Sequence, residues 1–146
     1  MLRKLTLVII TLWVGGLWMT GLTASILFDT ISDRSLAGNV AGQLFTTISY
    51  IGLVCGLVLL VERFISYQSA CYKQRYFWII VAMLLLIVIG QFGIQPLLAQ
   101  IKADALPSDV MSSEHANRFA AWHGVAGVVY LIECLLGIAL VLKAKQ

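Results

Sequence analysis

The sequence contains little charge. Only 12% of its 146 residues are Asp, Glu, Lys or Arg, whereas 60% are hydrophobic. A soluble globular domain is about 25% charged and about 45–50% apolar, so this chain could not cover its apolar surface in water. Its 10 basic residues are also too few and too scattered for a nucleic-acid-binding surface. The composition excludes a soluble domain and a nucleic-acid partner, and it indicates a protein whose solvent is the lipid bilayer.

Cysteine and histidine are scarce as well. The cysteines Cys55, Cys71 and Cys134 form no Cys-x-x-Cys pair, and their odd number argues against a disulfide framework. The histidines are His115 and His123. No P-loop, serine nucleophile elbow or dinucleotide-binding fingerprint occurs. An enzymatic activity therefore has no positive support in the sequence, and we expect no catalytic residue, metal or cofactor.

Long uncharged runs are what the sequence does contain. A hydrocarbon core of about 30 Å requires about 20 helical residues, and we predict four spanning helices over residues 5–28, 42–61, 76–98 and 119–142. A transmembrane β-strand would instead alternate over about ten residues. The sequence predicts an all-α integral membrane protein, a four-helix bundle forming one domain over residues 1–146. The expected connections are residues 29–38, 62–75 and 102–118.

The first run follows two basic residues, as the apolar region of a signal peptide does. Such a region is about 7–15 residues long and ends at an A-x-A-like cleavage site. This run is longer, and its best small-residue candidate, Ala24, has Leu22 two positions before it. We therefore expect an uncleaved spanning helix.

The basic residues that flank the runs indicate an orientation, because short cytoplasmic segments are enriched in Lys and Arg. One side of the predicted membrane carries Arg3, Lys4, Arg63, Lys73, Arg75, Lys143 and Lys145. The other side carries Arg34, Lys102 and Arg118. We expect both termini in the cytoplasm.

Small residues at regular spacing predict where the helices pack, since they let helix backbones approach closely in lipid. Gly52 and Gly56 form a small-x-x-x-small motif in the second run, and Gly124 is part of a similar one in the fourth. Gly15 and Gly16 lie in the middle of the first run. These glycines could pack helices within one chain or form the face of a homo-oligomer.

Glu133 is the unusual residue of the fourth run. A carboxylate in the middle of a membrane helix costs about 2.5 kcal/mol or more, so it should face the bundle interior or a wet cavity. Tyr130 shares its helix face. Counting from the outer helix ends places Gly15 and Gly16 of the first run and Gly52 and Gly56 of the second near its depth. Glu133 could bind a proton or cation, or it could be a protonated or hydrogen-bonded structural residue.

A second group of polar residues is expected in the outer half of the bundle. Counting depth places His123 level with Ser25, Gln43 and Gln95, and Gln91 shares a helix face with Gln95. The cluster could be a solute vestibule or a hydrogen-bond network that joins the helices. His123 could alternatively ligate a haem or metal ion, although no second histidine is suitably spaced.

Two stretches carry an ordered set of motifs. The first runs from Trp13-Val14-Gly15-Gly16 through Ile26-Leu27-Phe28 to Ala37-Gly38-x-x-Ala41-Gly42-x-Leu44-Phe45. The second contains Arg118-Phe119-x-x-Trp122-His123-Gly124, Tyr130-Leu131-Ile132-Glu133 and Leu135-Leu136-Gly137. The set resembles the DUF4149 family of small bacterial four-helix membrane proteins, which is related to eukaryotic transmembrane protein 205.

The chain departs from the family pattern at two places. Ser25 stands where the family often has proline, and Ala126 stands where it often has serine. The resemblance therefore implies neither a kink at the outer end of the first helix nor a hydroxyl one turn from His123. It implies a protein of the bacterial inner membrane without an established activity.

Three functions are compatible with these residues. The leading hypothesis is non-enzymatic handling or transport of a small solute or ion through Glu133 and the outer polar cluster, which in so short a chain would require a homo-oligomer. The second is a membrane scaffold or assembly factor. The third is a haem- or metal-binding redox protein with His123 as ligand.

Overall fold

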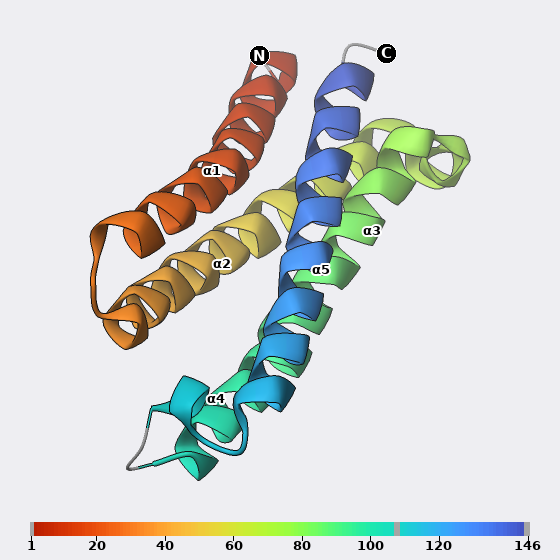
Figure 1. Ribbon diagram of the computed structural model, residues 1–146. Coiled ribbons are helices and arrows are strands. Elements are labelled where there is room, and N and C mark those ends of the chain that lie inside the picture. Colours follow the sequence, from red (N-terminus) through yellow and green to blue (C-terminus); the bar gives the residue numbers. More distant parts are fainter. Residues whose placement is uncertain (1, 107–108, 145–146) are drawn as a thin grey trace.

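The computed structural model describes residues 2–106 and 109–144, and the elements found in these residues are helices (Figure 1). They are α1 (Leu2–Thr30), α2 (Arg34–Tyr67), the 3-10 helix η1 (Gln68–Lys73), α3 (Arg75–Val88), the π-helix η2 (Ile89–Ile94), α4 (Gln95–Asp104), the 3-10 helix η3 (Val110–Ser112) and α5 (Ala116–Lys143). The all-α prediction is confirmed for the described residues. Lys145, used above for the orientation, lies outside them.

Four helical stretches are long and apolar enough to cross a membrane. They are Lys4–Thr30, Arg34–Lys73, Arg75–Asp104 and Ala116–Lys143. Each contains one of the predicted spans and extends beyond it. The predicted spans thus lie inside four long apolar helices, which exceed the length that a bilayer core would require.

The second helix differs most from its predicted bounds. It begins at Arg34 because Asp33 caps it, accepting hydrogen bonds from the backbone N–H groups of Ser35 and Leu36 at 2.9 and 3.1 Å. Its last turns, together with η1, occupy the segment predicted as the connection 62–75. That connection is helical, and the expected connection 29–38 is reduced to a few residues.

The core is centred on Trp13, whose side chain is fully buried (0% exposed). A Cβ atom added to Gly52 would lie 2.7 Å from Trp13 Nε1, and one added to Gly56 would lie 3.2 Å from Trp13 Cη2. The same positions would meet side chains of α3, Ile87 at Gly52 and Leu84 at Gly56. The Gly-x-x-x-Gly motif therefore makes room for an indole ring from α1 and aliphatic side chains from α3.

The other predicted packing glycines divide into two kinds. A Cβ atom at Gly16 would lie 2.7 Å from Ile48 Cδ1, so this glycine faces α2 closely. Gly15 and Gly124 would meet no atom within 4 Å. Their small size is not required by any contact between the described residues.

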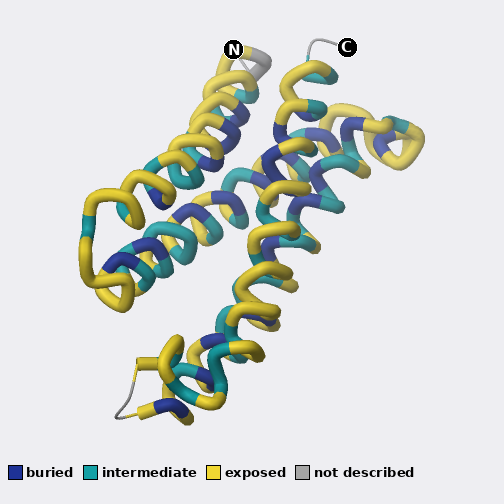
Figure 2. The backbone as a smooth tube through the Cα atoms, in the orientation of Figure 1, coloured by how far each residue is buried: buried dark blue, intermediate teal, exposed yellow. Residues whose placement is uncertain are grey.

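The four long helices pack closely at one end and diverge at the other. Both ends of the described chain lie at the closed end, whereas the α1–α2 turn and the lower part of α4 and α5 separate (Figure 1). The buried residues of α5 are Glu133, Cys134, Gly137 and Leu140, all in its second half. Its first half is mostly exposed (Figure 2). The main apolar cluster thus lies in the half of the molecule that carries the termini, and smaller sets of buried residues lie in the other half, among them Ala37 and Ala41 of α2 and Leu98 and Ile101 of α4.

A π-helical turn interrupts the third spanning helix. The backbone N–H of Gln95 bonds to the carbonyl of Gly90, five residues earlier. Pro96 follows in the first turn of α4 and has no N–H to donate, which weakens a regular α-helical pattern here. A π-turn accommodates one extra residue and is often found at functional sites. It fixes how α4 is rotated relative to α3.

We predict that Gly52→Ala destabilises the protein by about 1–3 kcal/mol relative to Gly15→Ala, because the new Cβ would collide with the rigid, buried Trp13 ring. Both substitutions gain the same helix propensity. Thermal unfolding of the purified protein in detergent measures the difference. Equal midpoints for the two variants would contradict the packing described for Trp13.

Candidate functional site

A polar cleft of about 490 Å³ lies between α2 and α4. We call it the α2–α4 cleft. Its lining residues are Gly38, Asn39, Gly42, Gln43, Thr46, Thr47, Gln95 and Lys102. The volume lies in the range of small-molecule sites, about 300–1,000 Å³.

Helical periodicity explains why these residues meet. On α2 the lining positions recur in pairs four residues apart, which keeps them on one helix face. On α4, Gln95 and Lys102 are seven residues apart and also share a face. From Asn39 to Thr47 the α2 wall rises about 12 Å at 1.5 Å per residue. The cleft therefore extends over more than two helical turns.

Lys102 connects three helices at one end of this cleft. Its Nζ donates a hydrogen bond to Asn39 Oδ1 on α2 at 3.1 Å. The same ammonium lies 5.6 Å from the centre of the Phe119 ring on α5, and that ring stacks on His123 with centroids 5.7 Å apart. Contacts from two neighbouring helices thus hold the ammonium group at the cleft.

The predicted outer polar cluster is only partly assembled. Gln43 and Gln95 both line the α2–α4 cleft. Gln91 lies half-buried in η2 and does not line it. Ser25 is exposed on α1 and donates to the carbonyl of Leu22 in its own helix. His123 is exposed on α5, and its ring contact is with Phe119.

Sequence reasoning missed several lining residues. Asn39 lies four residues before Gln43 and Thr46 three residues after it, so helical spacing on α2 could have revealed both. Lys102 was considered only as an orientation marker. Its sequence position at the end of an apolar run gives no sign that it contacts α2.

Glu133 lies in the core, 5% exposed, and its Oε1 has no hydrogen-bond partner among the described residues. One turn earlier on α5, the Tyr130 hydroxyl donates to the carbonyl of Leu17 on α1. One turn later, a Cβ atom at Gly137 would lie 3.2 Å from Val14. Glu133 therefore lies at the level of α1 between Val14 and Leu17, which is the level of Gly15 and Gly16.

Tyr130 also connects the level of Glu133 with the wall of the cleft. Its ring meets the edge of Phe45 on α2, with centroids 4.8 Å apart at 77°. Phe45 lies in sequence between the lining residues Gln43 and Thr46. Two aromatic rings thus lie between the helix that forms the cleft and the helix that carries the buried carboxyl.

A second buried polar atom lies in the same apolar core. Trp13 Nε1 has no hydrogen-bond partner in the described part of the chain, like Glu133 Oε1. An unpaired buried polar group costs about 1–3 kcal/mol, and such groups are rare enough to require an explanation. The core therefore holds an indole donor and a carboxyl oxygen whose hydrogen-bonding capacity is unused.

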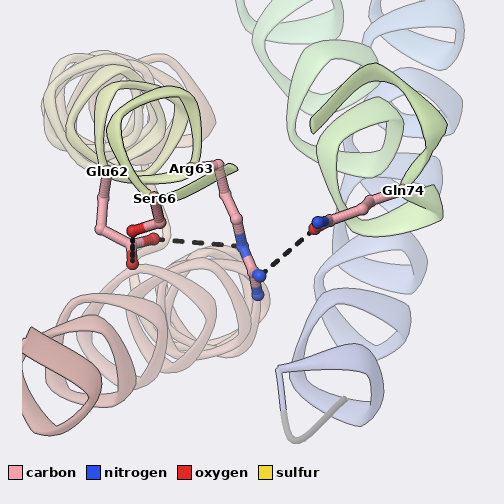
Figure 3. Close-up of polar contacts among 4 residues, drawn as sticks. All are labelled: Glu62, Arg63, Ser66 and Gln74. Atoms are coloured by element: carbon pink, nitrogen blue, oxygen red, sulfur yellow. Dashed lines mark hydrogen bonds and ion pairs between the residues drawn. The ribbon is translucent and has the colours of Figure 1, made fainter. Parts of the chain in front are cut away.

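A separate polar cluster fixes the connection between α2 and α3 (Figure 3). Arg63 is 9% exposed and donates through Nη1 to Gln74 Oε1 at 3.2 Å. Its guanidinium carbon lies 4.0 Å from the centre of the Tyr76 ring and 5.2 Å from that of Tyr67. Glu62 Oε2 lies 4.0 Å from Arg63 Nε. Arg63, expected in a loop, is a buried anchor that holds the start of α3 against α2.

Among residues 2–106 and 109–144, no three His, Cys, Asp or Glu side chains gather into a set that could hold a metal ion. His115 lies near Glu114, with 3.8 Å between Nε2 and Oε1. His123 lies eight residues after His115, within α5. In the described residues, His123 therefore belongs to no such set of three.

We predict that Arg63→Met destabilises the closed end by about 1–3 kcal/mol, because it removes the hydrogen bond to Gln74 and both ring contacts. Arg75→Met is the control, since Arg75 is exposed and its replacement makes the same change in net charge. Unfolding midpoints and the rate of proteolysis in segment 68–74 measure the effect. Equal behaviour of both variants would show that the Arg63 cluster contributes nothing to stability.

Comparison with known proteins adds one finding. The family model described as Domain of unknown function (DUF4149) matches residues 8–106. Neither the search of curated proteins nor the search of solved structures returned a match. The matched range includes α1 to α4 and the whole α2–α4 cleft, and it ends before α5. The motifs of residues 118–137 lie outside it. Because the match covers well over half of the chain, the protein belongs to the DUF4149 family.

Proposed function

We propose that this chain is a multi-pass protein of the bacterial inner membrane that handles or transports a small solute or ion without chemical conversion. The observation that carries the proposal is the α2–α4 cleft, an open hollow of about 490 Å³ with several polar side chains in its lining. Polar side chains within a membrane are costly and commonly mark the path of a solute or ion, which supports this proposal. The proposal also includes a relation to eukaryotic transmembrane protein 205.

The proposed orientation has both termini in the cytoplasm. It is supported by the seven basic residues of the N-terminus, the α2–α3 connection and the C-terminus, against three on the opposite side. In this orientation Lys102 and Asn39 face the outside, and the Arg63 cluster lies on the cytoplasmic side. The cleft would then receive solute from the outer aqueous phase.

Glu133 supplies the second part of the proposed path. Tyr130 and Phe45 form an aromatic barrier between the cleft and the carboxyl, and Glu133 takes up a proton or cation beyond that barrier. Support comes from the burial of Glu133, from its unpaired Oε1 and from the contact of the two rings. One short chain offers little room for a complete gated pathway, so a homo-oligomer is the proposed working form.

Solute passage is tested with proteoliposomes that contain the full chain. Stopped-flow light scattering follows vesicle swelling in isosmotic gradients of glycerol, choline chloride and sodium gluconate. We expect at least one solute to enter several-fold faster than into protein-free vesicles. Gln95→Leu should lower that rate because it makes the cleft wall apolar. Gln100→Leu, an exposed glutamine on the same helix, is the matched control.

Glu133→Gln distinguishes a functional from a structural carboxyl. The proposal expects this variant to assemble normally, as judged by a single symmetrical size-exclusion peak, and to lose solute-dependent swelling. A variant that fails to accumulate would assign Glu133 a structural role. Swelling at the wild-type rate by an intact Glu133→Gln protein would remove Glu133 from the path.

Topology is tested by labelling single cysteines in a chain whose native Cys55, Cys71 and Cys134 are replaced by serine or alanine. Thr47→Cys should react with a membrane-impermeant maleimide added from the periplasmic side. Ser69→Cys, exposed in η1, should react only after the cells are opened. The reverse pattern would invert the proposed orientation.

A further inference from the structure

We infer that the α2–α4 cleft binds a small, water-soluble organic anion with a single carboxylate and a polar, uncharged body, and that Lys102 selects it. The inference rests on the proposed function, because it names the solute class of the same cleft. It follows from the charge of the cleft, the state of the Lys102 ammonium and the polarity of the deeper wall.

The charge of the cleft has one sign. Lys102 is the ionisable residue among its lining side chains, and the other polar ones are amides and hydroxyls. A cationic solute would be repelled at the end where Lys102 stands. A dianion would leave one negative charge without a charged partner among the lining side chains. A monoanion balances the single ammonium.

The Lys102 ammonium is held in place and still has donors to offer. An ammonium has three N–H donors, and one of them bonds to Asn39 Oδ1. The Phe119 ring holds the same group from the side of α5. In the described part of the chain, no carboxylate lies within ion-pairing distance of Nζ. Lys102 therefore differs from a mobile surface lysine: its charge is positioned at the cleft and is not neutralised there.

The deeper wall favours an organic body over a halide ion. Gln95 lies seven residues before Lys102 on α4, which is about 10 Å along the helix. Gln43 and Thr47 line the opposite wall, and the Thr47 hydroxyl donates to the carbonyl of Gln43, leaving its lone pairs as acceptors. A glutamine amide both donates and accepts hydrogen bonds. A solute whose carboxylate binds Lys102 would therefore place hydroxyl or amide groups beside the deeper wall. An aliphatic tail at that place would form no hydrogen bond with the amides of Gln43 and Gln95.

Isothermal titration calorimetry on the full-length protein in detergent micelles tests this inference. The probes are sodium gluconate, a six-carbon hydroxy acid with one carboxylate, and sorbitol, a neutral polyol of the same length. We expect gluconate to bind and sorbitol to bind at least about tenfold more weakly, because a charged hydrogen bond contributes that much. Lys102→Met should raise the gluconate dissociation constant at least about tenfold, and Lys102→Arg should largely restore it.

The matched control is Lys73→Met. Lys73 is an exposed lysine in η1 at the other end of the molecule, and its replacement makes the same change in net charge. Its gluconate affinity should equal that of the wild type. Size-exclusion profiles and unfolding midpoints establish that each variant is folded, and Lys102→Gln replaces Lys102→Met if the latter does not fold. Gluconate binding that survives loss of the Lys102 charge would overturn the inference.

Failure of the inference and failure of the proposed function give different results. If sorbitol or choline chloride binds and Gln95→Leu removes that binding while gluconate does not bind, the cleft is a solute site but not an anion site. If no probe binds and none accelerates vesicle swelling, both the anion inference and the solute-handling proposal are wrong.

Discussion

The packing of this protein depends on the space that two glycines leave for one indole ring. Trp13 on α1 lies against Gly52 and Gly56 on α2, and Ile87 and Leu84 of α3 approach the same two positions. Lipid offers no hydrophobic drive for helix association, so dispersion contacts of this kind have to hold the helices together. Three helices therefore meet at one side chain, which explains why the apolar core is concentrated in the half of the molecule around Trp13.

Close packing in that half permits divergence in the other. Helices joined firmly at one end by Trp13 and by the Arg63 anchor can separate at the opposite end without losing the core. The space between α2 and α4 is then lined by amides, hydroxyls and one ammonium. The protein thus combines a mainly apolar half, which contains unpaired polar atoms of Glu133, Trp13 and Tyr76, with a half whose polar residues line a cleft.

Much of the architecture could be predicted from the sequence, because length and hydrophobicity are sufficient to recognise a helix that can span a membrane. The four runs lie within the four long helices. Their ends could not be predicted as well, since α2 begins at the Asp33 cap and includes polar turns that no hydropathy argument assigns to a helix. Arg63 was expected in a loop for the same reason: its charge suggested water, whereas it lies buried and contacts Gln74 and the Tyr76 ring.

The residues of the candidate site could be predicted only where their position on a helix face decides whether they line the cleft. Gln43 and Gln95 meet because both lie on faces turned toward the cleft. Ser25 and His123, placed at the same depth by counting residues, do not join them, because depth says nothing about the direction of a side chain or the divergence of the helices. The role of Lys102 depends on contacts with Asn39 and Phe119, residues far from it in sequence, and no local pattern encodes such contacts.

The π-turn of η2 gives the third span two independent helical phases. One additional residue rotates everything after it by about 100° relative to an uninterrupted α-helix. The face that α3 presents to Trp13 and the face that α4 presents to the cleft are therefore not the continuation of one stripe. Residues of α3 that pack in the core and residues of α4 that line the cleft therefore lie on different faces of the same long helix. A substitution on one of these faces leaves the other face unchanged.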